Sequence, residues 1–205
     1  MIIKELATKI RGGASVPHLK NTAECESVKM PSPSMVILPL QQHIGAPCQP
    51  TVKVGDKVAI GQVVGDTDAP VSAPIHATVS GVVTVVDNTA VHIESDGKDA
   101  LFSGIKRPEV KSRDEFLQAV RQSGVVGMGG AGFPTHVKLA LNDNVSVDTL
   151  IINGAECEPY ITADYREMME NCTQILAGIE WIMEYVGIKN CIIGIENNKP
   201  KAISF

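Results

Sequence analysis

The sequence lacks the cysteine patterns that hold metal ions or clusters. Its five cysteines are widely spaced and no C-x-x-C pair occurs, so the sequence predicts neither a zinc site nor an iron–sulfur site. The number of cysteines is also odd, which argues against a framework of disulfides. Scattered, reduced thiols of this kind indicate a cytoplasmic protein.

Three further features are scarce. No run approaches the roughly 18 apolar residues of a membrane span, so direct membrane insertion is not expected. The first residues, MIIKELATKIRGG, lack the apolar region of a signal peptide. The net charge of −5 gives no electrostatic case for binding nucleic acid or anionic lipid. The remaining composition, 44% hydrophobic and 20% charged, is that of a soluble protein with one large or two small domains.

Residues 1–35 are expected to form an irregular N-terminal strap, because glycines and prolines at positions 12, 13, 17, 31 and 33 break any long element. His18 and Lys20 could face a ligand, but a strap surrounded by solvent is the favoured interpretation. Residues 36–104 predict a compact β domain, since short apolar or alternating runs alternate with Gly, Asp and Pro. The three histidines of this region have no metal-ligand spacing and are interpreted as structural: His43, His76 and His92.

Two segments of the β domain, VKVGDKVAIGQVVG and APIHATVSGVVTVV, resemble the halves of a biotinyl or lipoyl carrier, a barrel-sandwich hybrid. Such carriers attach their cofactor to a lysine in the hairpin between the halves. Here that hairpin, residues 66–74, reads DTDAPVSAP and contains no lysine. We therefore expect a rigid module for packing or docking, without a covalent cofactor.

Residues 105–205 predict an α/β domain. An amphipathic helix is expected over residues 114–122, and two more over 163–171 and 172–186. Two short apolar runs, residues 150–152 and 191–195, predict buried strands. The predicted fold class is thus mixed α/β, with a β domain followed by an α/β domain.

The most distinctive stretch is Ser123–Lys138, which reads SGVVGMGGAGFPTHVK. It contains four glycines within six positions: Gly127, Gly129, Gly130 and Gly132. Glycine has no side chain to hold a ligand away, so such a run can lay its N–H groups against a phosphate or a flat ring. Pro134 suits the first turn of a helix, which is expected to continue through Leu141. Alone, the run is equally compatible with a surface turn.

A second stretch, DTLIINGAECEPY over residues 148–160, places two acids after a predicted strand. Glu156 and Glu158 follow the turn pair Asn153-Gly154. In an open α/β sheet, ligands bind at the carboxyl ends of strands, so these acids are candidate ligand contacts. The alternative is a pair of solvated loop acids.

Together the two stretches resemble the flavin site in the C subunit of the Rnf electron transport complex, and the motif is similar to that of the flavoprotein subunit of respiratory complex I. The N-terminal GGASVPHLK and the segment PLQQHIGAPCQPTVKVGDKV resemble the same Rnf subunit, so the resemblance covers nearly the whole chain. The fold that it implies is a barrel-sandwich hybrid followed by an FMN- and NADH-binding α/β domain. It also implies that the α/β domain is incomplete at Phe205, although a natural short paralogue is an alternative. Because a pocket at strand ends needs walls from several strands, we expect this chain alone to bind FMN weakly or not at all.

The resemblance implies roles for individual residues in binding FMN. The glycines would contact the flavin and its phosphate: Gly127, Gly129, Gly130 and Gly132. Lys138 would pair with the phosphate or with a flavin oxygen. Asn153 and Glu156 would hold the ring and the ribityl chain.

For NADH, the resemblance implies that Phe133 lies near the nicotinamide or adenine ring and that Glu158 faces the nucleotide. No residue of the chain is assigned as catalytic. Two positions depart from the complex I pattern: Met128 stands in place of an arginine and Ala155 in place of an aspartate. Both departures remove polar contacts with the ligand.

The function implied is oxidation of NADH by bound FMN, with electrons passed to two [4Fe–4S] clusters in chain beyond this stretch. The protein would bind other subunits of an ion-translocating membrane complex, peripherally at the cytoplasmic face. Two alternatives stay open: an electron-transfer adaptor for a soluble reductase system such as proline reductase, and a docking module without cofactor.

Overall fold

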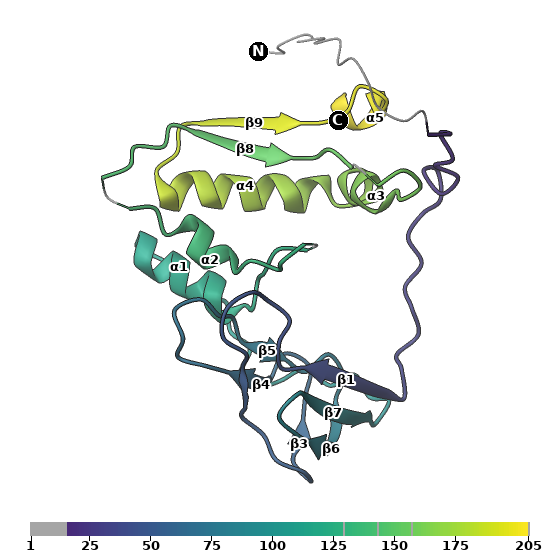
Figure 1. Cartoon of the computed structure of the whole chain (residues 1–205), viewed down its shortest axis with the longest axis vertical. Helices are drawn as coiled ribbons and strands as arrows, with labels where there is room; N and C mark the ends of the chain where they lie inside the picture. The colour runs from purple at the N-terminus through teal and green to yellow at the C-terminus, as the bar shows by residue number, and fades with distance from the viewer. Residues whose placement is uncertain (1–15, 129, 143, 157, 205) are drawn as a thin grey trace. The chain divides into compact units, whose positions relative to one another are not determined.

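The structure, a computed structural model, describes residues 16–128, 130–142, 144–156 and 158–204. They form two compact units, residues 28–150 with 178–191, and residues 16–27 with 151–177 and 192–204. Helices and strands both occur, the strands in several sheets (Figure 1), so the predicted mixed α/β class is confirmed.

The β module of the first unit is built from two sheets. One has the order β1-β7-β6-β3, and the other has the order β2-β4-β5. Neighbouring strands in both sheets pair antiparallel. The strand bounds are Met35–Pro39 (β1), Gln49–Pro50 (β2), Lys57–Val58 (β3), Val63–Asp66 (β4), Ile75–His76 (β5), Gly81–Val86 (β6) and Ala90–Ser95 (β7).

The core of the β module lies between these sheets and takes side chains from both. Val64 of β4 and Val83, Val91 and Ile93 of the other sheet are fully buried, and Leu40 is nearly so. In β6 and β7 the inward residues alternate with outward ones, as expected for strands with one face toward a core. The alternating runs seen in the sequence therefore produce the predicted sandwich.

Helix α1 (Arg113–Gln122) follows the β module. The Ser112 side chain caps its start by accepting the Glu115 N–H, and Gly124, with φ of +69°, follows its end. Phe116 is the buried residue of α1, and its ring stacks on Tyr185 of α4 (Cys172–Val186) with centroids 4.9 Å apart. The helices predicted over residues 114–122 and 172–186 are thus present, and this ring contact joins them.

Helix α2 (Thr135–Leu139) is shorter than predicted, since the expected continuation through Leu141 is wrong. Ala140 leaves the helical region with ψ of 68°. Asn142 then accepts the N–H of Asn144 at 2.9 Å, an Asx turn that competes with helix.

Strands β8 (Thr149–Asn153) and β9 (Asn190–Gly194) pair with each other and run in the same direction (Figure 1). Both lie where the apolar runs predicted strands, but the prediction that they are buried is wrong. Ile151 is 70% exposed, and Ile192 and Ile193 are exposed as well. With two strands in the sheet of the described chain, each strand is an edge strand, so its side chains have few neighbours. The other elements are α3 (Ala163–Glu170) and α5 (Pro200–Ile203).

Candidate functional site

The glycine-rich loop lies in the first unit, and two backbone hydrogen bonds close it at its base. Gly127 N–H donates to the Phe133 carbonyl at 2.9 Å, and Thr135 N–H donates to the Val125 carbonyl at 3.0 Å. Val126 and Pro134 form an antiparallel bridge between them. The loop therefore leaves the end of α1 and returns directly to the start of α2, as the sequence predicted.

The tip of this loop offers donors to a ligand. Between residues that the structure describes, the N–H groups of Met128, Gly130 and Ala131 donate no hydrogen bond. Gly130 has φ of +58°, and a Cβ added to it would have no neighbour within 4 Å, so a ligand can approach its backbone closely. A Cβ at Gly127 would lie 3.4 Å from Nζ of Lys138, which places that ammonium beside the loop. Gly129 lies outside the described residues.

An open hollow of about 460 Å³ lies against the loop. One wall is made by Gly127, Gly130, Ala131 and Gly132, and the other by residues Gln41–Ile44 of the β module. Exposed N–H groups on a glycine loop, a cation beside it and an open hollow are a donor set that suits a phosphate or the polar edge of a flat ring.

Gly132 differs from Gly130 in its surroundings. It is buried, has φ of +59°, and a Cβ there would stand 2.8 Å from the Gln42 carbonyl oxygen. The chain itself therefore already needs a glycine at this position. Phe133, expected near the nucleotide, is half-buried, and the side chain of Met128 is 98% exposed.

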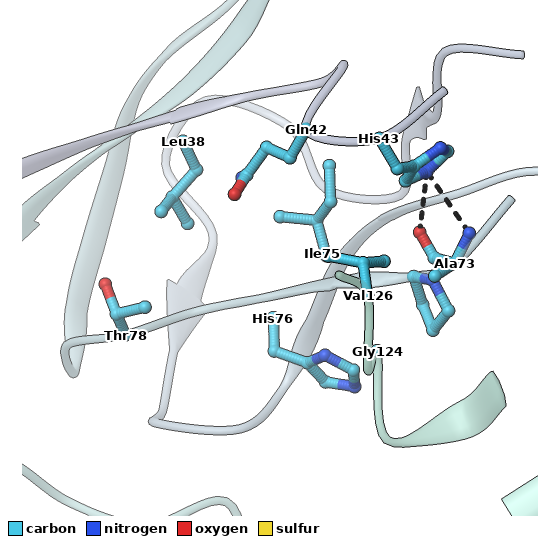
Figure 2. Close-up of a pocket in the computed structure, with 10 residues that line it drawn as sticks. Leu38, Gln42, His43, Ala73, Ile75, His76, Thr78, Gly124 and Val126 are labelled. Carbon is cyan, nitrogen blue, oxygen red and sulfur yellow. Dashed lines mark hydrogen bonds between the residues drawn. The ribbon is translucent and has the colours of Figure 1, made fainter. Parts of the chain in front are cut away.

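A second, smaller cavity of about 130 Å³ lies between the β module and the start of the loop (Figure 2). Gly124 and Val126 line it on one side, and His76 on another. Burial lowers the pKa of His76, which favours its neutral ring. Figure 2 shows His43 bonded to Ala73, whose backbone N and O both lie 3.2 Å from Nε2 of His43. These contacts agree with a structural role for both histidines.

The acidic turn belongs to the second unit and follows β8. Asn153 is exposed, and its Oδ1 accepts the Ala155 N–H at 3.1 Å, so its side chain shapes the turn. The Glu158 side chain is exposed and open to a ligand. Cys157 lies outside the described residues.

Glu156 is buried within a group of four charged side chains, which we call the charge cluster: Lys20, Glu156, Glu196 and Lys199. Oε2 of Glu156 lies 3.2 Å from Nζ of both Lys20 and Lys199, and Oε1 accepts the Asp164 N–H at 2.9 Å. Lys199 also pairs with Glu196 at 2.5 Å. Two carboxylates and two ammonium groups thus balance in charge.

The charge cluster sets the ionisation of its members. Burial alone would raise the pKa of Glu156, but hydrogen bonds from Lys20, the Asp164 N–H and Lys199 outweigh burial and lower it. Burial likewise opposes the charge of Lys199, yet Glu196 and Glu156 raise its pKa. The hydrogen bond from Lys199 lowers the pKa of Glu196. All three groups are therefore held in their charged forms at neutral pH.

Sequence reasoning misses most of this arrangement. Lys20 is expected on a solvated strap, but it reaches Glu156 and also donates to the carbonyls of Glu158 and Ile161, at 2.9 Å and 2.5 Å. Lys199 stands out in the sequence only as the start of a helix. The one available signal is Glu196, which follows β9 as Glu156 follows β8. The two lysines have no local pattern that marks them as partners.

The predicted site residues fall into two groups. The described glycines, Phe133 and Lys138 come together in the first unit, while Asn153, Glu156 and Glu158 come together in the second. The members of each group thus belong to the same unit. In the part of the chain that the structure describes, no group of three or more His, Cys, Asp or Glu side chains that could hold a metal ion is found.

Comparison with known proteins bears on both groups. Residues 8–113 match the family described as the RnfC barrel sandwich hybrid domain, and residues 120–205 match the Nuo51 FMN-binding domain. Fold and matches together define a flavin-domain protein with an N-terminal barrel-sandwich hybrid, as predicted. The chain belongs to the RnfC family.

Three relatives illustrate the match. The C subunit of a proton-translocating ferredoxin:NAD(+) oxidoreductase complex of Clostridium ljungdahlii is 44% identical, over 94% of this chain and 45% of the relative. The C subunit of a Na(+)-translocating complex of the same kind, from Acetobacterium woodii, is 43% identical over 94% and 46%. The C subunit of an ion-translocating oxidoreductase complex of Rhodobacter capsulatus is 43% identical over 95% and 40%. The chain spans less than half the length of these relatives.

The structure contains no candidate for a membrane span among the helices that it describes: none combines the necessary length with the necessary hydropathy.

Proposed function

We propose that this protein is the FMN-binding, NADH-oxidising electron-entry subunit of an Rnf-type ion-translocating complex. The observation that carries the proposal is the tip of the glycine-rich loop, where the N–H groups of Met128, Gly130 and Ala131 have no acceptor among the described residues. Membership of the RnfC family and the match to an FMN-binding domain support FMN as the ligand.

In the proposed site, the loop holds the anionic end of FMN. The free N–H groups donate to phosphate oxygens or ring carbonyls, and the glycines allow that approach because no Cβ intervenes. Lys138 neutralises negative charge beside Gly127. Bound FMN would accept a hydride from NADH and release electrons singly to an acceptor.

The acidic turn is proposed to serve the same reaction. The exposed Glu158 side chain accepts hydrogen bonds from the hydroxyls of NADH. Asn153 presents its amide at the carboxyl end of β8. Glu156 is expected from the sequence to bind the flavin or its ribityl chain, but with both oxygens engaged and its side chain 1% exposed, we assign it to holding the turn in place. Phe133 would stack near the nucleotide.

The proposed partners are NADH and the other subunits of the membrane complex, with the protein attached peripherally at the cytoplasmic face. The names of the relatives support this setting, because each is the C subunit of such a complex.

The test is FMN binding by the native-length protein, followed by reduction of ferricyanide with NADH. The wild type should bind one FMN and turn over. Gly130→Val should lose FMN, because a branched side chain would fill the open space at the loop tip. Val54→Ala, at an exposed turn of the β module, is the control and should retain flavin. A folded wild type without flavin, or a Gly130→Val protein that keeps it, would contradict the proposal.

A further inference from the structure

The hairpin Asp66–Pro74 of the β module forms hydrogen bonds with the end of α1. Arg121, in the last turn of that helix, lies with Nη2 2.8 Å from Oδ1 of Asp66 and 2.7 Å from the Thr67 carbonyl. The same nitrogen lies 3.3 Å from Oγ of Ser72, and Nη1 lies 3.5 Å from Oδ2 of Asp66. A planar guanidinium that contacts a carboxylate, a carbonyl and a hydroxyl fixes both the distance and the orientation of the end of α1 relative to the hairpin.

The start of the glycine-rich loop also rests on this hairpin. Gly124 follows α1, and a Cβ there would stand 2.7 Å from the Pro74 carbonyl oxygen and 3.0 Å from Nδ1 of His76. The start of the loop therefore lies directly against the β module.

The far side of the loop meets a second segment of the β module. Ile44 N–H donates to the Ala131 carbonyl at 2.9 Å, and Gly132 fits only because it has no Cβ beside the Gln42 carbonyl. Residues Gln41–Ile44 then form the wall of the hollow that faces the glycines. Gln41 is exposed, and its amide can both donate and accept, as the polar edge of a flavin ring requires.

We propose that the flavin site is composite: Gln41 of the β module contacts the bound ligand, and the Asp66–Arg121 pair positions the glycine-rich loop against that wall. This inference rests on the proposed function, since it concerns the same hollow. It assigns the β module a part in ligand binding rather than in docking alone.

The contact is tested by placing a tryptophan at Gln41 in the native-length protein. An indole touching an isoalloxazine ring quenches flavin fluorescence, so Gln41→Trp at saturating FMN should have a markedly lower quantum yield than the wild type. Val54→Trp, at another exposed position of the β module, should match the wild type. Equal yields in both variants would overturn the contact, while a wild type without FMN would instead overturn the proposed function.

The positioning role is tested with Asp66→Asn, which removes the charge that Arg121 contacts. The dissociation constant for FMN should rise roughly tenfold, as expected for loss of a charge-assisted hydrogen bond. Added to Gln41→Trp, the substitution should also reduce the quenching at saturating FMN, which a loss of stability alone would not do. Glu170→Gln, which breaks the Arg166–Glu170 pair at 2.6 Å in the other unit, is the matched control.

Hydrogen exchange gives a measurement that needs no flavin. The Ile44 amide should be protected in the wild type and should exchange faster in Asp66→Asn, because its acceptor is the Ala131 carbonyl. Unchanged FMN affinity and unchanged Ile44 exchange in Asp66→Asn would overturn the positioning role.

Discussion

The ammonium of Lys20 lies 3.2 Å from the carboxylate of Glu156, a residue 136 positions further along the chain. The two side chains are 10% and 1% exposed. A pair of charges so far from water persists only with full compensation, which Lys199, Glu196 and the Asp164 N–H complete. Lys20 is therefore an integral part of the support for the acidic turn.

This pair predicts a pH-dependent stability. The folded-state pKa of Glu156 is lowered, so its contribution is fully present above the ordinary glutamate pKa, about 4.3, and is lost as the pH falls through the lower folded-state value. Glu156→Gln should reduce the free energy of unfolding by about 3 kcal/mol near neutral pH, because two lysines lose a buried partner. Wild type and variant should converge as the solution is acidified.

Urea denaturation from about pH 3 to about pH 7 measures this difference. Glu158→Gln serves as the control, because the Glu158 side chain is exposed in the same turn. A Glu156→Gln protein with the same pH dependence as the wild type would show that the buried pair contributes nothing to stability.

The two glycines with similar φ should respond differently to alanine. Gly132→Ala brings a Cβ to 2.8 Å from the Gln42 carbonyl, in addition to a strain of about 1–2 kcal/mol at positive φ. Gly130→Ala carries the strain alone. We expect thermal unfolding to show the larger loss for Gly132→Ala, and flavin titration to show the more specific loss of affinity for Gly130→Ala. The reverse order would mean that the loop tip is packed and not open.

Glu158→Gln should raise the Michaelis constant for NADH and leave bound FMN unchanged. An exposed hydrogen bond of this kind is worth about 1 kcal/mol, which corresponds to roughly fivefold. NADH–ferricyanide kinetics and flavin stoichiometry on the same sample separate the two effects. Loss of flavin in this variant would move Glu158 from the nucleotide to the FMN contacts.

Met128→Arg should strengthen ligand binding, because it places a cation at the loop tip where Met128 is solvent-exposed. An added arginine near a phosphate is expected to tighten binding by about 1 kcal/mol or more at low salt, and less at high salt. Titrations of FMN and NADH at two salt concentrations test this. Met128→Gln, polar but uncharged, is the control, and equal affinities of the two variants would exclude a role for the charge.

The sequence contains enough local information to predict the elements and the loop. The glycine after α1, the apolar spacing of α4 and the alternation of apolar and polar residues in β6 and β7 can all be recognised from residues close together in the sequence. Burial of β8 could not be predicted in this way, because an apolar run indicates a strand without indicating what covers it. The charge cluster escapes prediction for a related reason: its lysines come from the N-terminal strap and from the start of α5, and no spacing rule links them to Glu156.

The hairpin Asp66–Pro74 also has a consequence for engineering. In a carrier, the corresponding tip must move freely to deliver its cofactor between distant sites. Here Asp66, Thr67 and Ser72 are all held by one guanidinium. A lysine grafted at the exposed Asp68 would therefore present a modifiable amine on an immobile anchor. Converting this module into a shuttle would require removal of Arg121 first, and with it the support of the neighbouring loop.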